Sequence, residues 1–231
     1  MKHTVRLKVC GMTVPKNIVD VASLQPEYLG FIFYEKSPRN FKGPMPKIPA
    51  KIKTVGVFVN AKISFILEKI KTYNLRAIQL HGDESAAFCQ RLRNEINTQQ
   101  AKTDPSQSKN TIKLWKVFSV KDRFDFTQLT SYEGIIDYFL FDTKGKNKGG
   151  NGITFDWTLL SKYQSKTPFI LSGGIGLDQI DSLKKFLQTP QASKLHAIDV
   201  NSKFENTPGI KNTQQLETFT TDLFTENQNF I

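Results

Sequence analysis

The sequence has little of what metal sites and disulfide frameworks are built from. It holds two cysteines and three histidines among 231 residues. It has no Cys-x-x-Cys or His-Glu-x-x-His spacing, so a dedicated metal site has few available ligands. We therefore expect chemistry that needs neither a metal nor another cofactor. Cys10 and Cys89 could form at most one disulfide, which excludes a disulfide-rich secreted scaffold.

Long apolar runs are also missing. No stretch is apolar over the length that a bilayer span requires, and the first residues lack the pattern of a secretory signal. Together with the low cysteine content, these absences predict a protein of the reducing cytoplasm that does not contact a membrane.

The features of a nucleic-acid surface are absent, although the chain is basic. It carries 32 basic and 21 acidic residues, a net charge of +11, with the excess in the first half. The lysines, such as Lys62, Lys69 and Lys71, are scattered without an interleaved aromatic platform or an arginine cluster. We interpret this charge as a solvated surface that also steers a small anionic substrate, and we expect no nucleic-acid partner.

What the sequence does contain is a regular alternation of apolar runs and helical segments. Apolar residues recur at helical spacing in Ala61–Tyr73, Glu84–Ile96 and Leu177–Leu187. Strands that are apolar almost throughout belong to a parallel sheet covered by helices, and eight such units close into a barrel. We therefore predict an α/β fold, a single (β/α)8 TIM barrel over residues 1–231. The eight predicted strands are Val5–Cys10, Leu29–Phe33, Thr54–Val59, Ala77–Leu80, Ile112–Phe118, Tyr138–Phe141, Pro168–Leu171 and Ala197–Val200.

One polar, low-complexity segment interrupts this pattern at about 97–110. It lies between the fourth helix and the fifth strand, at the end of a barrel that is remote from the active rim. We predict a mobile surface insertion there. No predicted helix has an excess apolar face, which favours a monomer over a homodimer.

Two groups that can transfer protons stand at the ends of predicted strands. Cys10 ends the first strand and Asp142 follows the sixth. Because the carboxyl ends of parallel strands meet at one rim, these residues could face a single substrate. We expect Lys8 on the inward face beside Cys10, where its ammonium would lower the pKa of the thiol. The alternative for Cys10 is an inert core thiol, which is how we interpret Cys89.

Other strand ends carry groups suited to an anionic ligand. Arg39 follows the second strand, and its planar guanidinium matches a carboxylate or a phosphate. Gln79 and His81 share the inward face at the end of the fourth strand. The alternatives are a solvated surface charge for Arg39 and a core histidine for His81.

Polar and glycine-rich turns follow the last two strands. Gly173 and Gly174 come directly after the seventh strand, and Asn201 and Ser202 after the eighth. Barrels often bind phosphate at these positions through bare backbone N–H groups, so we predict a phosphate site rather than ordinary turns. No Gly-x-x-x-x-Gly-Lys-Ser/Thr pattern is present, which disfavours a nucleoside triphosphate.

A series of short motifs runs in order from residue 7 to about residue 212. The motifs are Lys8–Thr13, Gly30–Phe33 with Lys36–Arg39, Val55–Phe58, Gln79–Glu84, Phe141–Thr143 with Gly149–Trp157, Leu171–Gly174, and Asp199–Ser202 with Glu205 and Pro208–Gly209. Together they resemble the phosphoribosylanthranilate isomerases of tryptophan biosynthesis. The resemblance implies a (β/α)8 barrel that acts on a small phosphorylated substrate.

The resemblance also implies a reaction and roles for residues. The reaction is the Amadori rearrangement of N-(5-phosphoribosyl)anthranilate to 1-(2-carboxyphenylamino)-1-deoxyribulose 5-phosphate, with Cys10 as the general base and Asp142 as the general acid. One acid and one base suffice for this chemistry. Arg39 would meet the anthranilate carboxylate, and Asp199 would lie near the sugar hydroxyls. The phosphate would be held by Gly173, Gly174, Asn201 and Ser202.

The sequence departs from the family pattern at two places, and other functions remain as alternatives. Asn151 stands where the family usually has threonine, and Thr13–Pro15 lacks a charged residue often found there. Another sugar-phosphate-binding barrel enzyme, such as an indole-glycerol-phosphate synthase or a pentose-phosphate epimerase, would carry lysine–glutamate pairs or metal-binding histidines at the strand ends, and we find neither. A non-catalytic basic binding protein would retain RNA through a salt-sensitive contact.

Overall fold

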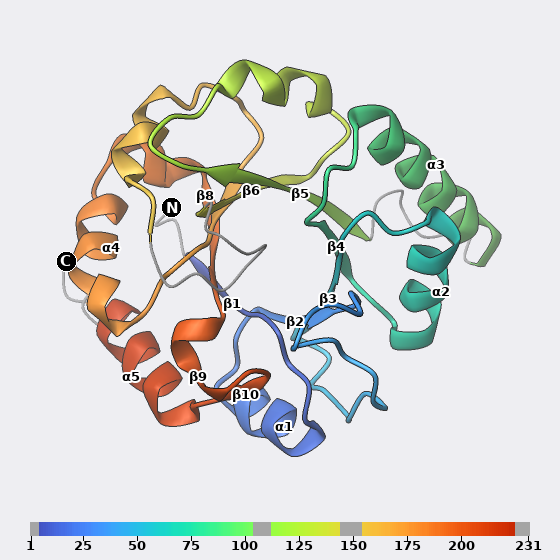
Figure 1. Cartoon of the computed structure of the whole chain (residues 1–231), viewed down its shortest axis with the longest axis horizontal. Coiled ribbons are helices and arrows are strands. Elements are labelled where there is room, and N and C mark those ends of the chain that lie inside the picture. Colours follow the sequence, from blue (N-terminus) through green and yellow to red (C-terminus); the bar gives the residue numbers. More distant parts are fainter. Residues whose placement is uncertain (1–4, 104–111, 144–153, 225–231) are drawn as a thin grey trace.

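Eight parallel strands form a closed barrel in the order of the sequence, with β8 hydrogen-bonded to β1 (Figure 1). The computed structural model describes residues 5–103, 112–143 and 154–224. The predicted (β/α)8 barrel and its eight strands are confirmed, with strand ends that coincide or differ by at most two residues. The strands are β1 (Arg6–Val9), β2 (Tyr28–Ile32), β3 (Lys53–Phe58), β4 (Ala77–Leu80), β5 (Lys113–Val120), β6 (Tyr138–Thr143), β7 (Phe169–Leu171) and β8 (Leu195–Val200).

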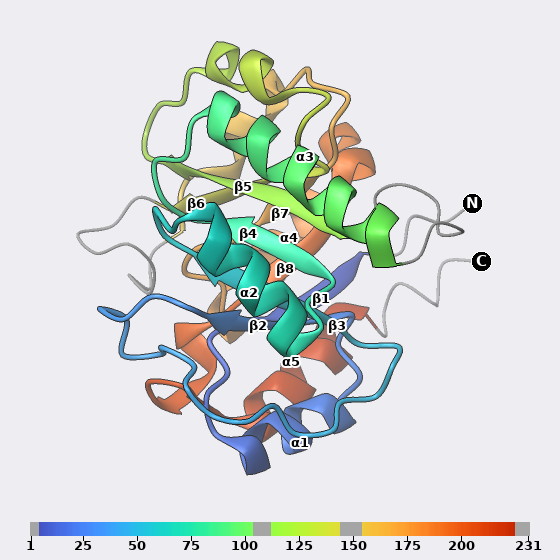
Figure 2. The ribbon, with the colours of Figure 1, turned by 90° about the vertical axis from the view of Figure 1, so that its right-hand side faces the viewer.

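Five α-helices of the described residues cover the outside of this barrel (Figure 2). The two helices predicted after the third and fourth strands are confirmed as α2 and α3, and the predicted helix Leu177–Leu187 is a 3₁₀ turn at Leu177–Gln179 continued by α4. None of the helices in the described ranges is long and apolar enough to cross a bilayer. The helices are α1 (Pro15–Ser23), α2 (Ile63–Tyr73), α3 (Ala86–Thr103), α4 (Ile180–Leu187) and α5 (Thr213–Phe224).

The predicted polar insertion at 97–110 is helical over its first part. Helix α3 continues to Thr103, beyond its predicted end at Ile96, and residues 104–110 lie outside the described residues. Gln99 of this extension is exposed. The extension therefore has no apolar stripe by which the sequence could have marked it as helix.

Regular alternation of strand and helix fails at three connections. Among the described residues, no helix joins β2 to β3, and only 3₁₀ turns at Phe126–Tyr132 and Trp157–Lys162 follow β5 and β6. Aromatic side chains pack edge to face over this part of the barrel, with ring centroids 4.9 Å apart for Phe124 and Phe126. Large rings bury much apolar area per residue, so they cover these strands where helices are missing. The cluster includes Phe118, Phe124, Phe126, Phe139, Phe141, Tyr163 and Phe169.

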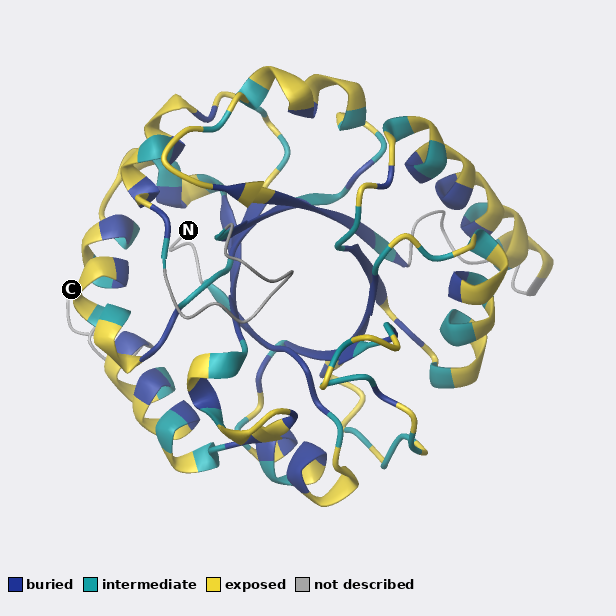
Figure 3. Cartoon of the chain, viewed as in Figure 1, coloured by how far each residue is buried: buried dark blue, intermediate teal, exposed yellow. Residues whose placement is uncertain are grey.

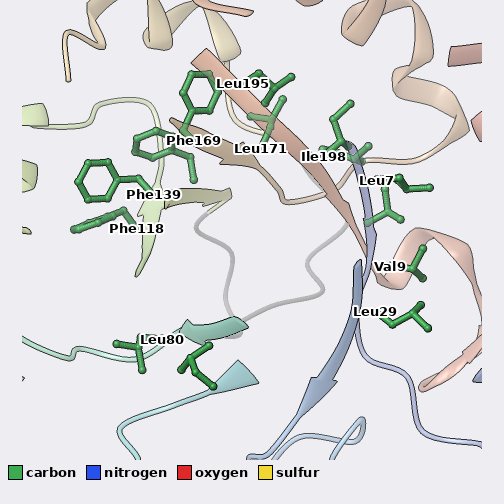
Figure 4. Packing of buried hydrophobic residues seen from close by; sticks show 14 of the residues in the cluster. Leu7, Val9, Leu29, Leu80, Phe118, Phe139, Phe169, Leu171, Leu195 and Ile198 are labelled. Carbon is green, nitrogen blue, oxygen red and sulfur yellow. The ribbon is translucent and has the colours of Figure 1, made fainter. Parts of the chain in front are cut away.

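The core has two layers, one on each side of the sheet. Side chains such as Leu7, Val9 and Leu29 lie on the outer side of the ring of strands, toward the helices (Figure 4). The strands and the inward faces of the helices are buried, whereas the outward faces are exposed (Figure 3). A separate cluster that includes Tyr28, Trp115 and other residues packs inside the barrel. The barrel interior is therefore filled, as in other barrels of this type, and the rim is the place for a site.

Candidate active site

A pocket at the carboxyl ends of the strands brings together every residue predicted for the site. Its polar lining comes from the last residues of β4, β6 and β8 and from the segments that follow β1, β2, β4, β7 and β8. Ile32, Tyr34, Val57 and Val59 give it an apolar wall. Side chains that are far apart in the sequence thus line a single pocket. The predicted residues that line it are Cys10, Arg39, Gln79, His81, Asp142, Gly173, Gly174, Asp199, Asn201 and Ser202.

The thiol of Cys10 is placed by the alternation of β1. Leu7 and Val9 point outward into the helix-facing core, so Lys8 and Cys10 face the barrel interior. Cys10 is 4% exposed and unoxidised, and its backbone N–H donates to the carbonyl of Val200 at 2.9 Å. Gly30 on β2 makes room for the sulfur, because a Cβ there would lie 2.8 Å from Sγ.

Lys8 is paired with Asp199. Its Nζ donates to Oδ1 of Asp199 at 2.7 Å, and the two side chains are 0% and 5% exposed. The pairing follows from the parallel register that sets Lys8 opposite Asp199 on β8. The second carboxylate oxygen accepts a hydrogen bond from Ser172 at 3.4 Å, and Asp199 borders the pocket.

Lys8 lowers the pKa of the Cys10 thiol, as predicted, but its influence is not the largest one and the net pKa is raised. Burial raises the pKa of the Cys10 thiol, and the charge of Lys8 opposes only part of that effect. The neighbouring Asp199 carboxylate also raises the thiol pKa. Burial raises the pKa of Asp199 itself, against the pull of Lys8. The ammonium and the carboxylate thus offset one another beside the sulfur.

Asp142, His81 and Gln79 form a chain of polar side chains across β6 and β4. Oδ2 of Asp142 lies 3.2 Å from Nε2 of His81, and Nδ1 of His81 lies 3.3 Å from Nε2 of Gln79. Asp142 is 6% exposed, and Oε1 of Gln79 is buried without a hydrogen-bond partner among the described residues. A donor on a ligand that enters the pocket could satisfy that oxygen.

Arg39 lines the pocket and forms an ion pair with the carboxylate of Glu205. Its Nε and Nη2 donate to both oxygens of Glu205 at 2.7–3.0 Å, and its side chain is 14% exposed. Nη1 has no partner among the described residues and remains available to a ligand. Burial would raise the pKa of Glu205, but the hydrogen bonds from Arg39 and the charge of Lys211 outweigh it and lower that pKa.

The predicted phosphate turns have the backbone shapes that glycine allows. Gly173 has φ +91° and Gly174 has φ +67°, which side chains rarely adopt. A Cβ at Gly173 would also collide with the backbone of Thr143. Asn201 and Ser202 follow the neighbouring strand β8 and line the same pocket, before the short hairpin of β9 (Glu205–Thr207) and β10 (Ile210–Lys211). The position of Asn151 lies outside the described residues.

Several residues of the site were not predicted for it. Ser172 and Lys203 line the pocket, and Glu205 and Lys211 hold residues that line it. Glu205 appeared only as part of a motif. Nothing in the local sequence marks Lys211 as buried. Within the described ranges, no group of three or more His, Cys, Asp or Glu side chains is arranged to hold a metal ion.

Comparisons with known proteins agree on one family. The sequence profile of the N-(5'-phosphoribosyl)anthranilate (PRA) isomerases matches residues 7–222. A relative from Parabacteroides distasonis named N-(5'-phosphoribosyl)anthranilate isomerase is 39% identical over 219 residues, covering 92% of this chain and 90% of the relative. A relative of the same name from Phocaeicola vulgatus is 36% identical over 217 residues, covering 94% and 97%.

Solved structures of the same name share the fold. Phosphoribosyl anthranilate isomerase from Thermotoga maritima superposes with a TM-score of 0.77 at 27% identity, covering 95% of this chain and 98% of that one. A phosphoribosyl anthranilate isomerase in complex with reduced 1-(o-carboxyphenylamino)-1-deoxyribulose 5-phosphate gives 0.74 at 26% identity, with the same coverage.

Proposed function

The chain belongs to the N-(5'-phosphoribosyl)anthranilate isomerase family of tryptophan biosynthesis, and we propose that Cys10 and Asp142 carry its proton transfers. The reaction is the Amadori rearrangement of N-(5-phosphoribosyl)anthranilate to 1-(2-carboxyphenylamino)-1-deoxyribulose 5-phosphate. The observation that carries the proposal is that one buried thiol and one buried carboxyl, from β1 and β6, border the same pocket. One base and one acid are what this isomerisation needs.

The rearrangement consists of ring opening, removal of the C2 proton and tautomerisation, each of which involves a proton transfer. Asp142 gives its proton to the furanose ring oxygen, and the bond between that oxygen and C1 breaks to leave an iminium ion. The Cys10 thiolate removes the proton on C2, whose bonding electrons form the C1=C2 bond of an enolamine. Tautomerisation then removes the proton of the C2 hydroxyl and adds one to C1, which leaves a ketone at C2. Transfer of a proton from the Cys10 thiol to the Asp142 carboxylate through solvent restores the base and the acid.

The surroundings of Asp142 bear on its role as an acid. Asp142 is nearly buried, and it borders the pocket that the substrate would enter. His81 at 3.2 Å fixes the direction of the carboxyl group. We assign His81 and Gln79 to orienting the substrate and the acid.

The two ends of the pocket match the two ends of the substrate. Arg39, next to the apolar wall formed by Ile32 and Val57, suits the carboxylate and the ring of anthranilate. Asp199 is placed for the sugar hydroxyls. The phosphate is assigned to the turns formed by Gly173, Gly174, Asn201 and Ser202.

Replacement of the proposed base tests this assignment. Cys10→Ala is expected to lower kcat by roughly two to four orders of magnitude while product affinity stays nearly unchanged, because the thiolate acts in the transition state. Turnover is followed by the loss of anthranilate fluorescence. Cys89→Ala is the matched control, since that thiol is buried in α3 and does not border the pocket. Near-normal turnover of Cys10→Ala removes Cys10 from the mechanism.

We further propose a cytoplasmic monomer that acts on a small phosphorylated molecule without a nucleic-acid partner. The fold uses no disulfide between its two cysteines, Cys10 and Cys89, which fits a reducing compartment. Few large apolar side chains are exposed among the described residues, and the most exposed, Val19, is 49% accessible. A stable interface has an apolar core, which these residues supply poorly. Light scattering in solution tests the monomer, and a mass of two chains contradicts it.

A further inference from the structure

Lys211 is a buried cation to which the mechanism assigns no role. It lies on β10, which follows the last barrel strand in the sequence. Its side chain is 0% exposed and does not line the pocket. The side chain of Asn17 hydrogen-bonds both polar groups of the Lys211 backbone. The backbone N–H donates to Oδ1 of Asn17 at 2.7 Å, and the carbonyl accepts from Nδ2 of Asn17 at 2.9 Å. A buried ammonium is costly unless it is fully paired, so its partners indicate what it holds.

Those partners lead to two binding groups of the proposed site, Asn201 and Arg39. Nζ of Lys211 donates to Oε1 of Glu205 at 2.6 Å, to Oδ1 of Asn201 at 2.7 Å and to the carbonyl of Asn201 at 3.3 Å. An ammonium has three N–H donors, and three acceptors are present. Two of them belong to Asn201 in the phosphate turn, and the third belongs to Glu205, the carboxylate that holds Arg39.

Glu205 extends the link to the anthranilate end. Its two oxygens accept three hydrogen bonds from Nε and Nη2 of Arg39, and one oxygen also accepts from the backbone N–H of Gly209 at 3.1 Å. Such a forked contact fixes the plane of the guanidinium. The direction of Nη1, the nitrogen left for a ligand, is therefore set by Glu205.

Arg39 and Asn201 are also held close together in space. A Cβ added to Gly11, the glycine after Cys10, would lie 2.7 Å from Oδ1 of Asn201 and 2.8 Å from Cδ of Arg39. Gly11 has φ +76°, so a side chain there would be strained as well. The chain thus packs both binding residues against the backbone that carries the proposed base.

We propose that Lys211 and Glu205 are positioning residues that align Arg39 with the substrate carboxylate and Asn201 with the substrate phosphate. The inference rests on the proposed function, which gives Arg39 and Asn201 their ligands. Lys211 contacts Asn201 directly, whereas Glu205 contacts Arg39 directly and reaches Asn201 only through Lys211. This difference gives the two residues distinct signatures in binding experiments.

Lys211→Met is expected to raise KM by roughly 10–100-fold with a smaller change in kcat, because small displacements of binding groups weaken substrate positioning. It also weakens inhibition by inorganic phosphate, the probe for the Asn201 end.

Arg93→Met is the control. Arg93 is a buried cation bonded to Asp137 and to the carbonyls of Ile112 and Ile135, away from the pocket, so its loss lowers stability and leaves KM unchanged. A KM and a phosphate inhibition constant for Lys211→Met equal to those of the wild type overturn the proposal.

Glu205→Gln keeps the shape of the side chain and tests the proposal even if Lys211→Met does not fold. Alone it lowers affinity for the reduced product analogue and weakens phosphate inhibition less than Lys211→Met does, because Glu205 reaches Asn201 only through Lys211. In the background of Arg39→Met its effect on affinity for the analogue is much smaller, because Arg39 is then no longer there to be positioned. Equal losses in both backgrounds overturn the proposal. A failure of the proposed function is separate: Arg39→Met alone would then leave the affinity for the analogue unchanged.

Discussion

Replacing Lys8 by Met is expected to destabilise the barrel. Nζ of Lys8 lies 2.7 Å from Oδ1 of Asp199, and the side chains are 0% and 5% exposed. Removing one partner of such a pair leaves a buried charge unpaired, which costs about 3–5 kcal/mol of unfolding free energy. For a chain of this length, each kcal/mol corresponds to about 2–4 °C, so the melting temperature falls by about 6–20 °C at neutral pH.

The loss depends on pH because Asp199 can take up a proton. Burial already raises the pKa of Asp199, and loss of the Lys8 charge raises it further. A carboxyl whose pKa is higher in the folded than in the unfolded protein adds no penalty below the unfolded value. It destabilises the fold as the pH rises toward the folded value. The deficit of Lys8→Met against the wild type therefore grows between about pH 5 and about pH 8.

Urea and thermal unfolding at both pH values measure this effect. The double variant Lys8→Met with Asp199→Asn removes the unpaired charge and recovers most of the stability at the higher pH. Lys16→Met is the control, since Lys16 pairs with Asp20 on the surface with side chains 85% and 43% exposed, and its loss costs less than about 1 kcal/mol. A deficit that is equal at both pH values, or a double variant no more stable than Lys8→Met, refutes the reasoning.

Two further predictions concern activity and binding. Because burial raises the pKa of the Cys10 thiol, the thiolate fraction and kcat/KM are expected to rise from about pH 7 to about pH 9; a flat profile over that range would argue against Cys10 as the base. Arg39→Met is expected to weaken the binding of anthranilate-bearing ligands roughly 10–100-fold, the value of a hydrogen bond to a charged group. Arg39→Met leaves inorganic phosphate binding unchanged in competition assays. Equal losses of affinity for both ligands would contradict separate binding groups for the carboxylate and the phosphate.

The sequence could predict the strands and the direction of their side chains. In β1 the alternation of Leu7 and Val9 with Lys8 and Cys10 settles which residues face inward, because each strand has two faces and one covers an apolar core. The rim position of Asp142 followed from its place at the end of an apolar run. These features depend only on local periodicity.

The partners of these residues could not be predicted in the same way. Lys8 meets Asp199 because closure of the barrel sets the register of β1 against β8, and no local pattern fixes that register. The net rise of the Cys10 pKa could not be predicted either, because it depends on how deeply the folded barrel buries the thiol. Likewise, Glu205 reaches Arg39 across 166 positions of sequence. The missing helices after β5 and β6 are replaced by aromatic packing between distant segments, such as Phe126 with Phe141.

Turnover of Asp142→Asn on two ligands tests the central claim most directly. The amide keeps the shape and the hydrogen-bonding capacity of the side chain, so binding persists, but it cannot protonate the ring oxygen. The variant is expected to be nearly inactive on N-(5-phosphoribosyl)anthranilate and to regain much of its rate on an analogue whose sugar is already open. If it is equally inactive on the open-chain analogue, Asp142 acts after ring opening, and its assignment as the ring-opening acid is wrong.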